Sequence, residues 1–323
     1  MDNLTHSLAG AILGQMGLKT KTGLAMPTLI IAANIPDIDA VAVLLGGHQH
    51  LALRRGLTHG PIAMVLLPVL LWAAMLAWDK WRPSEKRLPV HKGWLLALAY
   101  IGTLSHPALD WLNNYGVRLL EPFSSQWFYG DSIFIIDLWI WAALIAGVWI
   151  SLRREKRGNT NWRRPAVLGF FAVCSYIFAN GMITGQAESM ARDQIIARYD
   201  PTASMLEPEV VANPVPIAFW QREIVWRDEQ DYGSGSYSLG TGPVLLGEVR
   251  PHNMGQGAAS RTMPFRVVAD PGSDAAAFLF WSRMPVLEQQ DDALIIRDQR
   301  FMDPRIGDRF LLRIPVPTEI PAR

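Results

Sequence analysis

Four apolar segments in the first part of the chain have the length that a helix needs to cross a lipid bilayer. A transmembrane helix takes about 17 to 25 mostly apolar residues, and lipid offers no water to pair with the backbone of a looser structure. These segments therefore restrict this part of the chain to a bundle of membrane helices. They cover residues 61–78, 93–109, 133–152 and 166–183.

Two weaker apolar segments, residues 7–17 and 24–45, precede these four. The first is short for a span, and the second contains Asn34, Asp37 and Asp39. We expect both to be half-buried helices or re-entrant elements covered by protein. Half of all residues are hydrophobic, which fits this interpretation. The net charge of +1 leaves no basic surface for nucleic acid, and the single cysteine forms no disulfide within the chain.

Lysine and arginine set the expected orientation, because cytoplasmic loops of membrane proteins carry an excess of both. Residues 79–92 contain five of them and residues 151–165 contain six, whereas residues 110–132 contain only Arg118. The two basic loops are expected in the cytoplasm, which places the chain from residue 184 onward on the outer side. Arg54 and Arg55 fall on the outer side in this scheme, against the rule.

Histidine and aspartate residues gather where the apolar segments meet that outer side. Imidazole and carboxylate are the usual ligands of Zn²⁺, Mn²⁺ and Fe²⁺, and neither belongs in lipid without a partner. If Lys19 and Lys21 mark an inner turn, the outer set comprises His6, Asp37, Asp39, His59, His106, Asp110, Asp131 and Asp137. The sequence thus predicts a metal site at the outer membrane surface.

His106 and Asp110 are four residues apart, so both side chains lie on one face of a helix, about one turn apart. Two ligands on one rigid face make half of a metal site. The alternative is a buried hydrogen bond between the two side chains.

Asp37 and Asp39 follow Pro36, which favours an extended segment or turn over continuous helix. Residues two apart in an extended segment point the same way, and two such carboxylates suit one or two metal ions. The alternative is that Asn34 and Asp37 cap a helix that starts afterwards.

His6 and His59 both follow a Leu-Thr dipeptide, residues 4–5 and 57–58. The shared tripeptide indicates two similar helix entries in which threonine caps the helix or hydrogen-bonds the neighbouring ligand. The alternative is a chance match.

Residues 184–323 differ in character from the apolar part, residues 1–183. Short alternating or β-branched stretches are separated by glycine, proline and aspartate, which predicts strands joined by turns. We expect a small β-rich domain outside the cytoplasm, entered through a helix at residues 186–199. The expected strands lie within residues 217–226, 237–249, 276–284 and 309–316.

The polar motifs resemble those of the YdjM-like family of bacterial inner-membrane proteins, which are described as metal-dependent hydrolases. The resemblance rests on five short stretches in order, residues 2–7, 34–39, 55–60, 106–110 and 130–137. It implies a multi-pass protein of the bacterial inner membrane whose metal ligands come from His6, Asp37, Asp39, His59, His106, Asp110 and further candidates Asp131 and Asp137. The family has proline after its last aspartate, whereas Leu138 stands here, which weakens the transfer to Asp137.

That family is distantly similar to zinc phospholipase C and P1-type nucleases, which implies a phosphoester or phospholipid substrate. We therefore expect a helical membrane domain followed by a β-rich domain, with zinc or manganese activating water against an amphiphilic ester. Asp39 or Asp131 would act as general base. Two other classes stay open, a transporter of ions or protons and a metal-stapled scaffold or sensor whose outer domain binds a protein partner.

Overall fold

The chain forms two compact units in the computed structural model, which describes residues 1–198, 208–228, 231–245, 250–251, 273–290, 293–302 and 310–315. The helical unit comprises Met1–Val41, Arg54–Met182 and Pro214–Phe219. The sheet unit comprises Ala42–Leu53, Ile183–Asn213 and Trp220–Arg323. The main division therefore falls at Ile183, and two short segments belong to the other unit than their neighbours in sequence.

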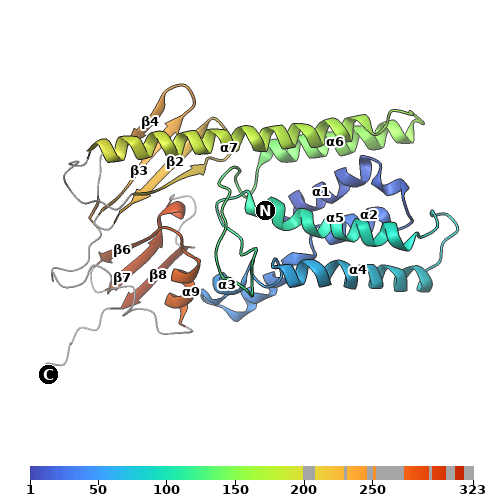
Figure 1. Ribbon diagram of the computed structural model, residues 1–323, viewed down its shortest axis with the longest axis horizontal. Helices are drawn as coiled ribbons and strands as arrows, with labels where there is room; N and C mark the ends of the chain where they lie inside the picture. Colours follow the sequence, from blue (N-terminus) through green and yellow to red (C-terminus); the bar gives the residue numbers. More distant parts are fainter. Residues whose placement is uncertain are drawn as a thin grey trace. The chain divides into compact units, whose positions relative to one another are not determined.

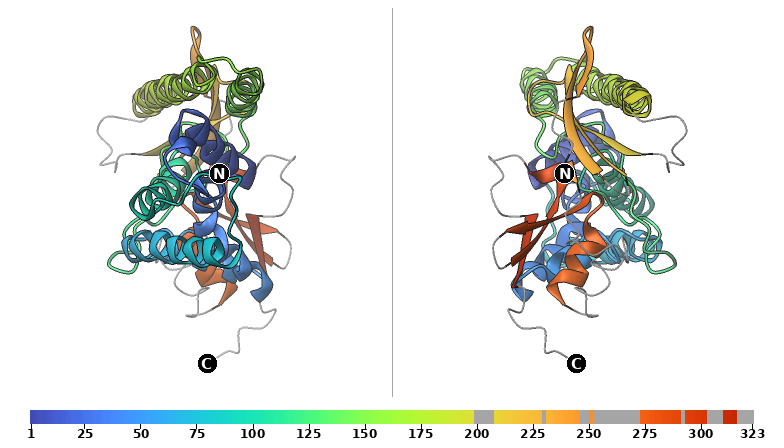
Figure 2. Two further views of the ribbon diagram at one scale, coloured as in Figure 1. Left: turned by 90° about the vertical axis from the view of Figure 1, so that its right-hand side faces the viewer. Right: turned by 90° about the vertical axis from the view of Figure 1, so that its left-hand side faces the viewer.

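The longer helices of the helical unit run side by side, and Figure 2 shows them end-on (Figures 1 and 2). Several begin at a side chain that accepts hydrogen bonds from the free N–H groups of the first turn. Asp2 caps α1, His91 caps α5 and Asp137 caps α6. The elements are α1 (Asn3–Gln15), η1 (Leu18–Thr20), α2 (Ala25–Ala32), η2 (Ile35–Leu45), α4 (Pro61–Trp81), α5 (Lys92–Trp111), α6 (Leu138–Lys156) and the first part of α7 (Arg164–Arg198).

Small residues let α1 and α5 approach α2 closely. A Cβ atom on Gly10 would lie 2.7 Å from the carbonyl oxygen of Leu29, and one on Gly102 would lie 2.5 Å from Cβ of Ala32. Buried side chains such as Leu98 fill the remaining space between α2 and α5. This packing brings the backbones of α1 and α5 close to that of α2.

The basic segments meet at one end of the helical unit. Lys19 contacts Glu155 at the end of α6 and lies over the ring of Trp162, 4.6 Å from its centroid. At the same end, Gly23 donates a backbone hydrogen bond to Pro89, which precedes α5. The turn at Lys19 and the two basic loops are thus neighbours, as the sequence analysis assumed.

Two helices of the described chain, α4 and α7, are long and apolar enough to cross a membrane. A third span arises if α2 and η2, bent by 40° at their junction, count as one broken span or re-entrant loop. The expected segments at 93–109 and 133–152 do contain helices α5 and α6. The polar residues of α5 and the charged end of α6 lower the mean hydropathy of these two helices. Of the four expected spans, those at residues 61–78 and 166–183 therefore correspond to helices that can cross a membrane.

The sheet unit contains two small sheets with antiparallel pairing. In one, the order is β1-β2-β3-β4 with β5 also paired to β3, and in the other it is β6-β7-β8. The strands are β1 (Glu209–Pro214), β2 (Gln221–Arg227), β3 (Asp231–Ser238), β4 (Gly242–Leu245), β5 (Arg250–Pro251), β6 (Pro285–Gln290), β7 (Ala293–Asp298) and β8 (Leu311–Pro315).

Three of the four expected strand regions contain strands, β2, β3 with β4, and β8, while residues 246–249, 309 and 316 lie outside the described residues. The strand expected at 276–284 is wrong, because α9 (Asp274–Trp281) forms there. Ser273 caps this helix by accepting from the N–H of Ala276, and alanine favours helix in its first turns.

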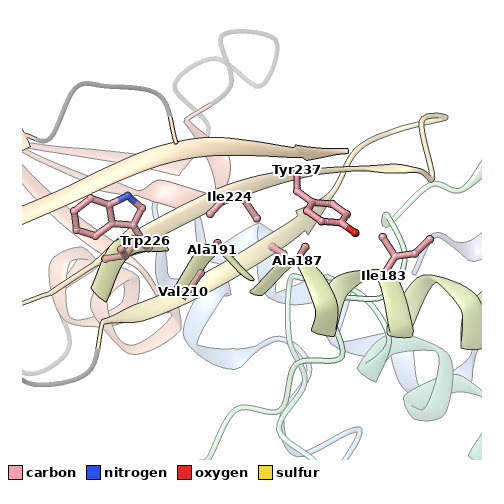
Figure 3. Close-up of a cluster of buried hydrophobic side chains, with 9 residues drawn as sticks. Ile183, Ala187, Ala191, Val210, Ile224, Trp226 and Tyr237 are labelled. Atoms are coloured by element: carbon pink, nitrogen blue, oxygen red, sulfur yellow. The ribbon is translucent and has the colours of Figure 1, made fainter. Parts of the chain in front are cut away.

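The second half of α7 packs along the first sheet. Figure 3 shows Ile183, Ala187 and Ala191 of the helix against side chains of β1, β2 and β3. The strand residues are Val210, Ala212, Ile224, Trp226 and Tyr237. This cluster confirms the helix expected at residues 186–199 up to Arg198; Tyr199 lies outside the described residues.

A short piece of the N-terminal sequence also belongs to the sheet unit. Helix α3 (Gln49–Leu53) packs against α9. The carboxylate of Asp274 accepts hydrogen bonds from the backbone N–H of His48 and the side chain of Gln49. The chain thus leaves the helical unit after Val41 and returns to it at Arg54.

Candidate metal centre

Four side chains from three elements converge at the end of the helical unit opposite the basic loops. They are Asp37 of η2, His59 of the loop before α4, and His106 and Asp110 of α5. One ligand atom from each lies within 4.8 Å of the others, and all four residues are buried. Such a donor set matches the histidine and carboxylate ligands of zinc and related ions.

Asp110 is the hub of this group. Its Oδ2 lies 3.3 Å from Nε2 of His59 and 3.5 Å from Nε2 of His106. Nε2 of His106 in turn lies 3.7 Å from Oδ1 of Asp37. These distances are longer than charge-assisted hydrogen bonds, and they leave room for an ion between the four atoms.

The tautomer of His106 follows from its surroundings. Nδ1 lies 2.7 Å from the carbonyl oxygen of Ala33, which follows the last turn of α2 and accepts but cannot donate. Nδ1 must therefore carry the proton when the ring is neutral. The lone pair of Nε2 then faces Asp37 and Asp110.

His59 is fixed in the same tautomer by another route. The hydroxyl of Thr58 donates to Oδ2 of Asp39 at 2.7 Å, so its oxygen accepts from Nδ1 of His59 at 2.9 Å. The lone pair of Nε2 therefore faces Asp110. Burial holds the pKa of His59 well below its usual range, which keeps the ring neutral and ready to bind a cation.

His6 lies on the other side of Asp110, outside the group of four. Its ring stacks on that of His106 at a centroid distance of 3.8 Å, and its Nε2 lies 3.4 Å from Oδ1 of Asp110. The amino group of Met1 contacts the same oxygen. His6 is therefore placed to bind the side of Asp110 that the other histidines do not face.

Asp37 and Asp39 contact different histidines, and of the extended segment or turn expected for them the extended geometry is wrong. Both lie in the 3-10 helix η2, where residues two apart are on different faces. Asp37 faces His106, whereas Asp39 lies behind His59, with its Oδ2 3.5 Å from Nδ1. Pro36 fits the first turn of η2 because its missing N–H is not needed there.

Asp131 and Asp137 lie outside the group of four. Asp131 is buried in the loop before α6 with a left-handed φ of 46°, and its neighbour Ser132 donates its backbone N–H to Leu112 after α5. Asp137 caps α6 and accepts a hydrogen bond from the hydroxyl of Tyr176. Neither belongs to the group of four.

Arg54 and Arg55 are the site residues that the sequence analysis did not assign. Nε of Arg55 lies 3.1 Å from Oδ2 of Asp110, and its backbone N–H donates to Asp39. Burial lowers the pKa of Arg55 to about 10, so the guanidinium group stays charged at neutral pH. Arg54 lies 3.7 Å from Asp37 and 3.8 Å from Asp39. Their place on the outer side, against the positive-inside rule, was the signal in the sequence.

The site contains several buried polar atoms without hydrogen-bond partners among the described residues. They include Nε2 of all three histidines, Oδ1 of Asp37 and both carboxylate oxygens of Asp110, which have ion-pair contacts with Met1 and Arg55 but no hydrogen bond from any described residue. Native structures rarely leave so many buried polar atoms unsatisfied in one place. A divalent cation would satisfy them, and the residues present therefore fit a metal ion.

Comparison with known proteins agrees with the resemblance in the sequence motifs. The model of a family described as YdjM inner membrane protein matches residues 1–187. No curated protein and no solved structure matches the chain. The family match includes every residue of the group of four.

Proposed function

Because this chain belongs to the YdjM inner membrane protein family, we propose that it is a membrane-bound hydrolase whose metal ion is held by Asp37, His59, His106 and Asp110. Its substrate is a phosphoester or another lipid-like ester. The observation that carries the proposal is the pair of Nε2 lone pairs, on His59 and His106, that face the buried carboxylate of Asp110. Lone pairs and carboxylate oxygens repel one another unless a cation lies between them.

A divalent ion at this position supplies Lewis acidity, which activates water and polarises an ester oxygen. The protein's own part is to present the two histidines in one tautomer and to exclude bulk water. Asp39 is our preferred general base over Asp131. Its Oδ1 has no hydrogen-bond partner in the described part of the chain, and the residue adjoins the group of four.

The proposal places the site at the outer face of the inner membrane and the sheet unit outside the cytoplasm. The basic segments support this placement, since they lie together at the end of the helical unit opposite the group of four.

The first test is elemental analysis of the full chain purified in mild detergent. The protein should contain stoichiometric zinc or manganese, and His59→Ala and His106→Ala should lose it. His50→Ala serves as a matched control, because His50 lies in the sheet unit. Wild type that is folded and free of metal after incubation with zinc would overturn the proposal.

Hydrolysis is tested separately with the metal-loaded protein and a panel of phosphoesters and carboxylic esters. We expect turnover that stops on chelation and is absent in His106→Ala. A protein that binds zinc, unfolds when it is removed and hydrolyses none of the esters would instead be a metal-stapled scaffold.

A further inference from the structure

The candidate site becomes more exposed from Asp110 toward Arg54. The side chain of Asp110 is 0% exposed, those of Asp37 and Asp39 are 7% and 8% exposed, and that of Arg54 is 27% exposed. Arg54 is therefore the most solvent-accessible of these four side chains.

The guanidinium group of Arg54 is not satisfied by its neighbours. Its distances to Asp37 and Asp39, 3.7 and 3.8 Å, exceed the roughly 2.7–2.9 Å of a charge-assisted hydrogen bond. Its buried Nε has no hydrogen-bond partner within the described residues. The guanidinium group of Arg54 thus keeps unused hydrogen-bonding capacity beside the two carboxylates.

The charge of the site favours an anion once the metal is bound. Three carboxylates, those of Asp37, Asp39 and Asp110, face the guanidinium groups of Arg54 and Arg55. A divalent ion turns this small negative excess into a positive one. A neutral ester would leave that excess charge uncompensated in a largely buried place.

We propose that Arg54, with Arg55 beside it, binds the anionic oxygens of a phosphate ester and so selects phosphoesters over neutral carboxylic esters. This inference rests on the proposed metal-dependent hydrolase. The planar fork of an arginine matches two phosphate oxygens, whereas Lys offers only a point charge. Arg55 is held too deeply to meet the ligand first and acts on the same anion from behind Asp110.

The backbone around Arg54 is built to hold this position. Arg55 adopts a left-handed φ of 54°, which is unfavourable for a residue with a side chain. Arg118 donates its backbone N–H to the carbonyl oxygen of Arg55 and its guanidinium to that of Arg54. A Cβ atom on Gly56 would lie 2.3 Å from the same guanidinium group. The surrounding contacts therefore fix the two arginines toward the carboxylates.

Apolar side chains adjoin the same edge. Ile38, between Asp37 and Asp39, is 54% exposed, and Leu57, beside Gly56, is 62% exposed. In a membrane protein such side chains face lipid, which favours a phosphate that is carried on a lipid over one that is free in water.

The test measures binding of inorganic phosphate to the zinc-loaded full chain by calorimetry. Arg54→Gln should weaken phosphate binding by about tenfold or more, because hydrogen bonds to charged groups are the strong ones. Arg54→Lys should bind phosphate with an affinity between those of wild type and Arg54→Gln, since lysine keeps the charge but lacks the planar fork of arginine. Arg157→Gln, an exposed arginine at the end of α6, should leave phosphate binding unchanged.

Zinc content, measured on the same samples, separates the possible failures. Arg54→Gln that keeps its zinc and binds phosphate as tightly as wild type overturns the role of Arg54 and leaves the metal site intact. Wild type without zinc overturns both proposals. A variant that loses its zinc points to a structural role for Arg54, and Arg54→Lys that also loses it overturns anion binding as its main role.

The source of the phosphate is resolved by competition. Nanodiscs that contain phosphatidic acid, nanodiscs of phosphatidylcholine alone and soluble glycerol phosphate are each tested for displacement of inorganic phosphate. Stronger displacement by phosphatidic acid supports a lipid substrate, and stronger displacement by glycerol phosphate supports a soluble one. Displacement by neither contradicts recognition of phosphate esters.

Discussion

The Nε2 atom of His59 lies 3.3 Å from Oδ2 of Asp110, with no hydrogen bond to it from any residue that the structure describes. His59 belongs to the loop before α4, and Asp110 ends α5. The proton of the imidazole is committed to Thr58 on the opposite side of the ring. The two atoms therefore face each other as two electron donors, which is the arrangement of ligands around a cation.

Asp110→Asn should remove the hub of the metal centre while keeping its shape. We expect zinc affinity to fall by about 100-fold or more, since even residues behind a ligand cost about 10- to 100-fold. Zinc should raise the melting temperature of wild type and leave that of the variant unchanged. Asp79→Asn, in the last turn of α4 at the end with the basic loops, is the control. Stoichiometric zinc in Asp110→Asn would contradict the assignment of Asp110.

Thr58→Val should weaken the metal centre without touching a ligand. The hydroxyl of Thr58 links Asp39 to Nδ1 of His59. Without it, the His59 ring is no longer restricted to the tautomer with the proton on Nδ1. Zinc affinity should fall by about 10- to 100-fold, measured by competition with a chelator. Thr20→Val, at the other end of the helical unit, should bind zinc as wild type does. Equal affinities for the two variants would show that Thr58 does not orient His59.

Gly102→Ala should disturb the site from a distance. The added Cβ would lie 2.5 Å from Cβ of Ala32 and 3.0 Å from the carbonyl oxygen of Leu29, so α2 must move away from α5. Ala33 then withdraws its carbonyl oxygen from His106, and both melting temperature and zinc affinity should drop. Gly185→Ala in α7 meets no atom within 4 Å of the described chain and serves as the matched substitution. Unchanged zinc affinity in Gly102→Ala would argue against this coupling.

The ion pair of Asp298 and Arg300 should make the sheet unit sensitive to acid. Burial acts to raise the pKa of Asp298, but the charge of Arg300 and hydrogen bonds from Arg300 and Ser282 outweigh it and hold the pKa below its usual range. A depressed carboxyl pKa stabilises the fold above the unfolded value of about 3.9, and that stability is lost as pH falls through the folded pKa.

Asp298→Asn should therefore destabilise the sheet unit at neutral pH by about 3–5 kcal/mol, as broken buried pairs do. Its readout is hydrogen exchange at the amides of Arg283 and Arg300, which donate to Asp298. The control Asp193→Asn, at an exposed position, should change hydrogen exchange at these amides little. Protection in Asp298→Asn that equals that of wild type, at pH 7 and at pH 4, would contradict the prediction.

Much of the site could be predicted because ligand residues are costly in lipid and because Lys and Arg mark one side of a membrane. Those two rules placed His59, His106 and Asp110 at one end of the helices, where they meet. The i, i+4 spacing of His106 and Asp110 also predicted their shared face. Each of these inferences needs only the local sequence and a general rule about which residues are tolerated in or beside a membrane.

Other parts depend on contacts that no local pattern contains. The carbonyl oxygen of Ala33 fixes the tautomer of His106 through tertiary packing alone. Pro36 suggested extended chain, although a 3-10 turn tolerates it equally well. Alternation over 276–284 suggested a strand, but burial of Phe278 and Trp281 on one helix face prevailed. Arg54 and Arg55 looked misplaced until their carboxylate partners were known.

Because segment 42–53 belongs to the sheet unit, truncating the chain after the helical part would affect the candidate site. Asp39 lies just before the chain leaves the helical unit, and Arg54 lies where the chain returns to it. Their charged groups are 3.8 Å apart. Between them the chain is anchored to α9 by Asp274. A protein cut at residue 187 would keep every metal ligand and lose that anchor, so the two charged residues would be joined by an untethered loop.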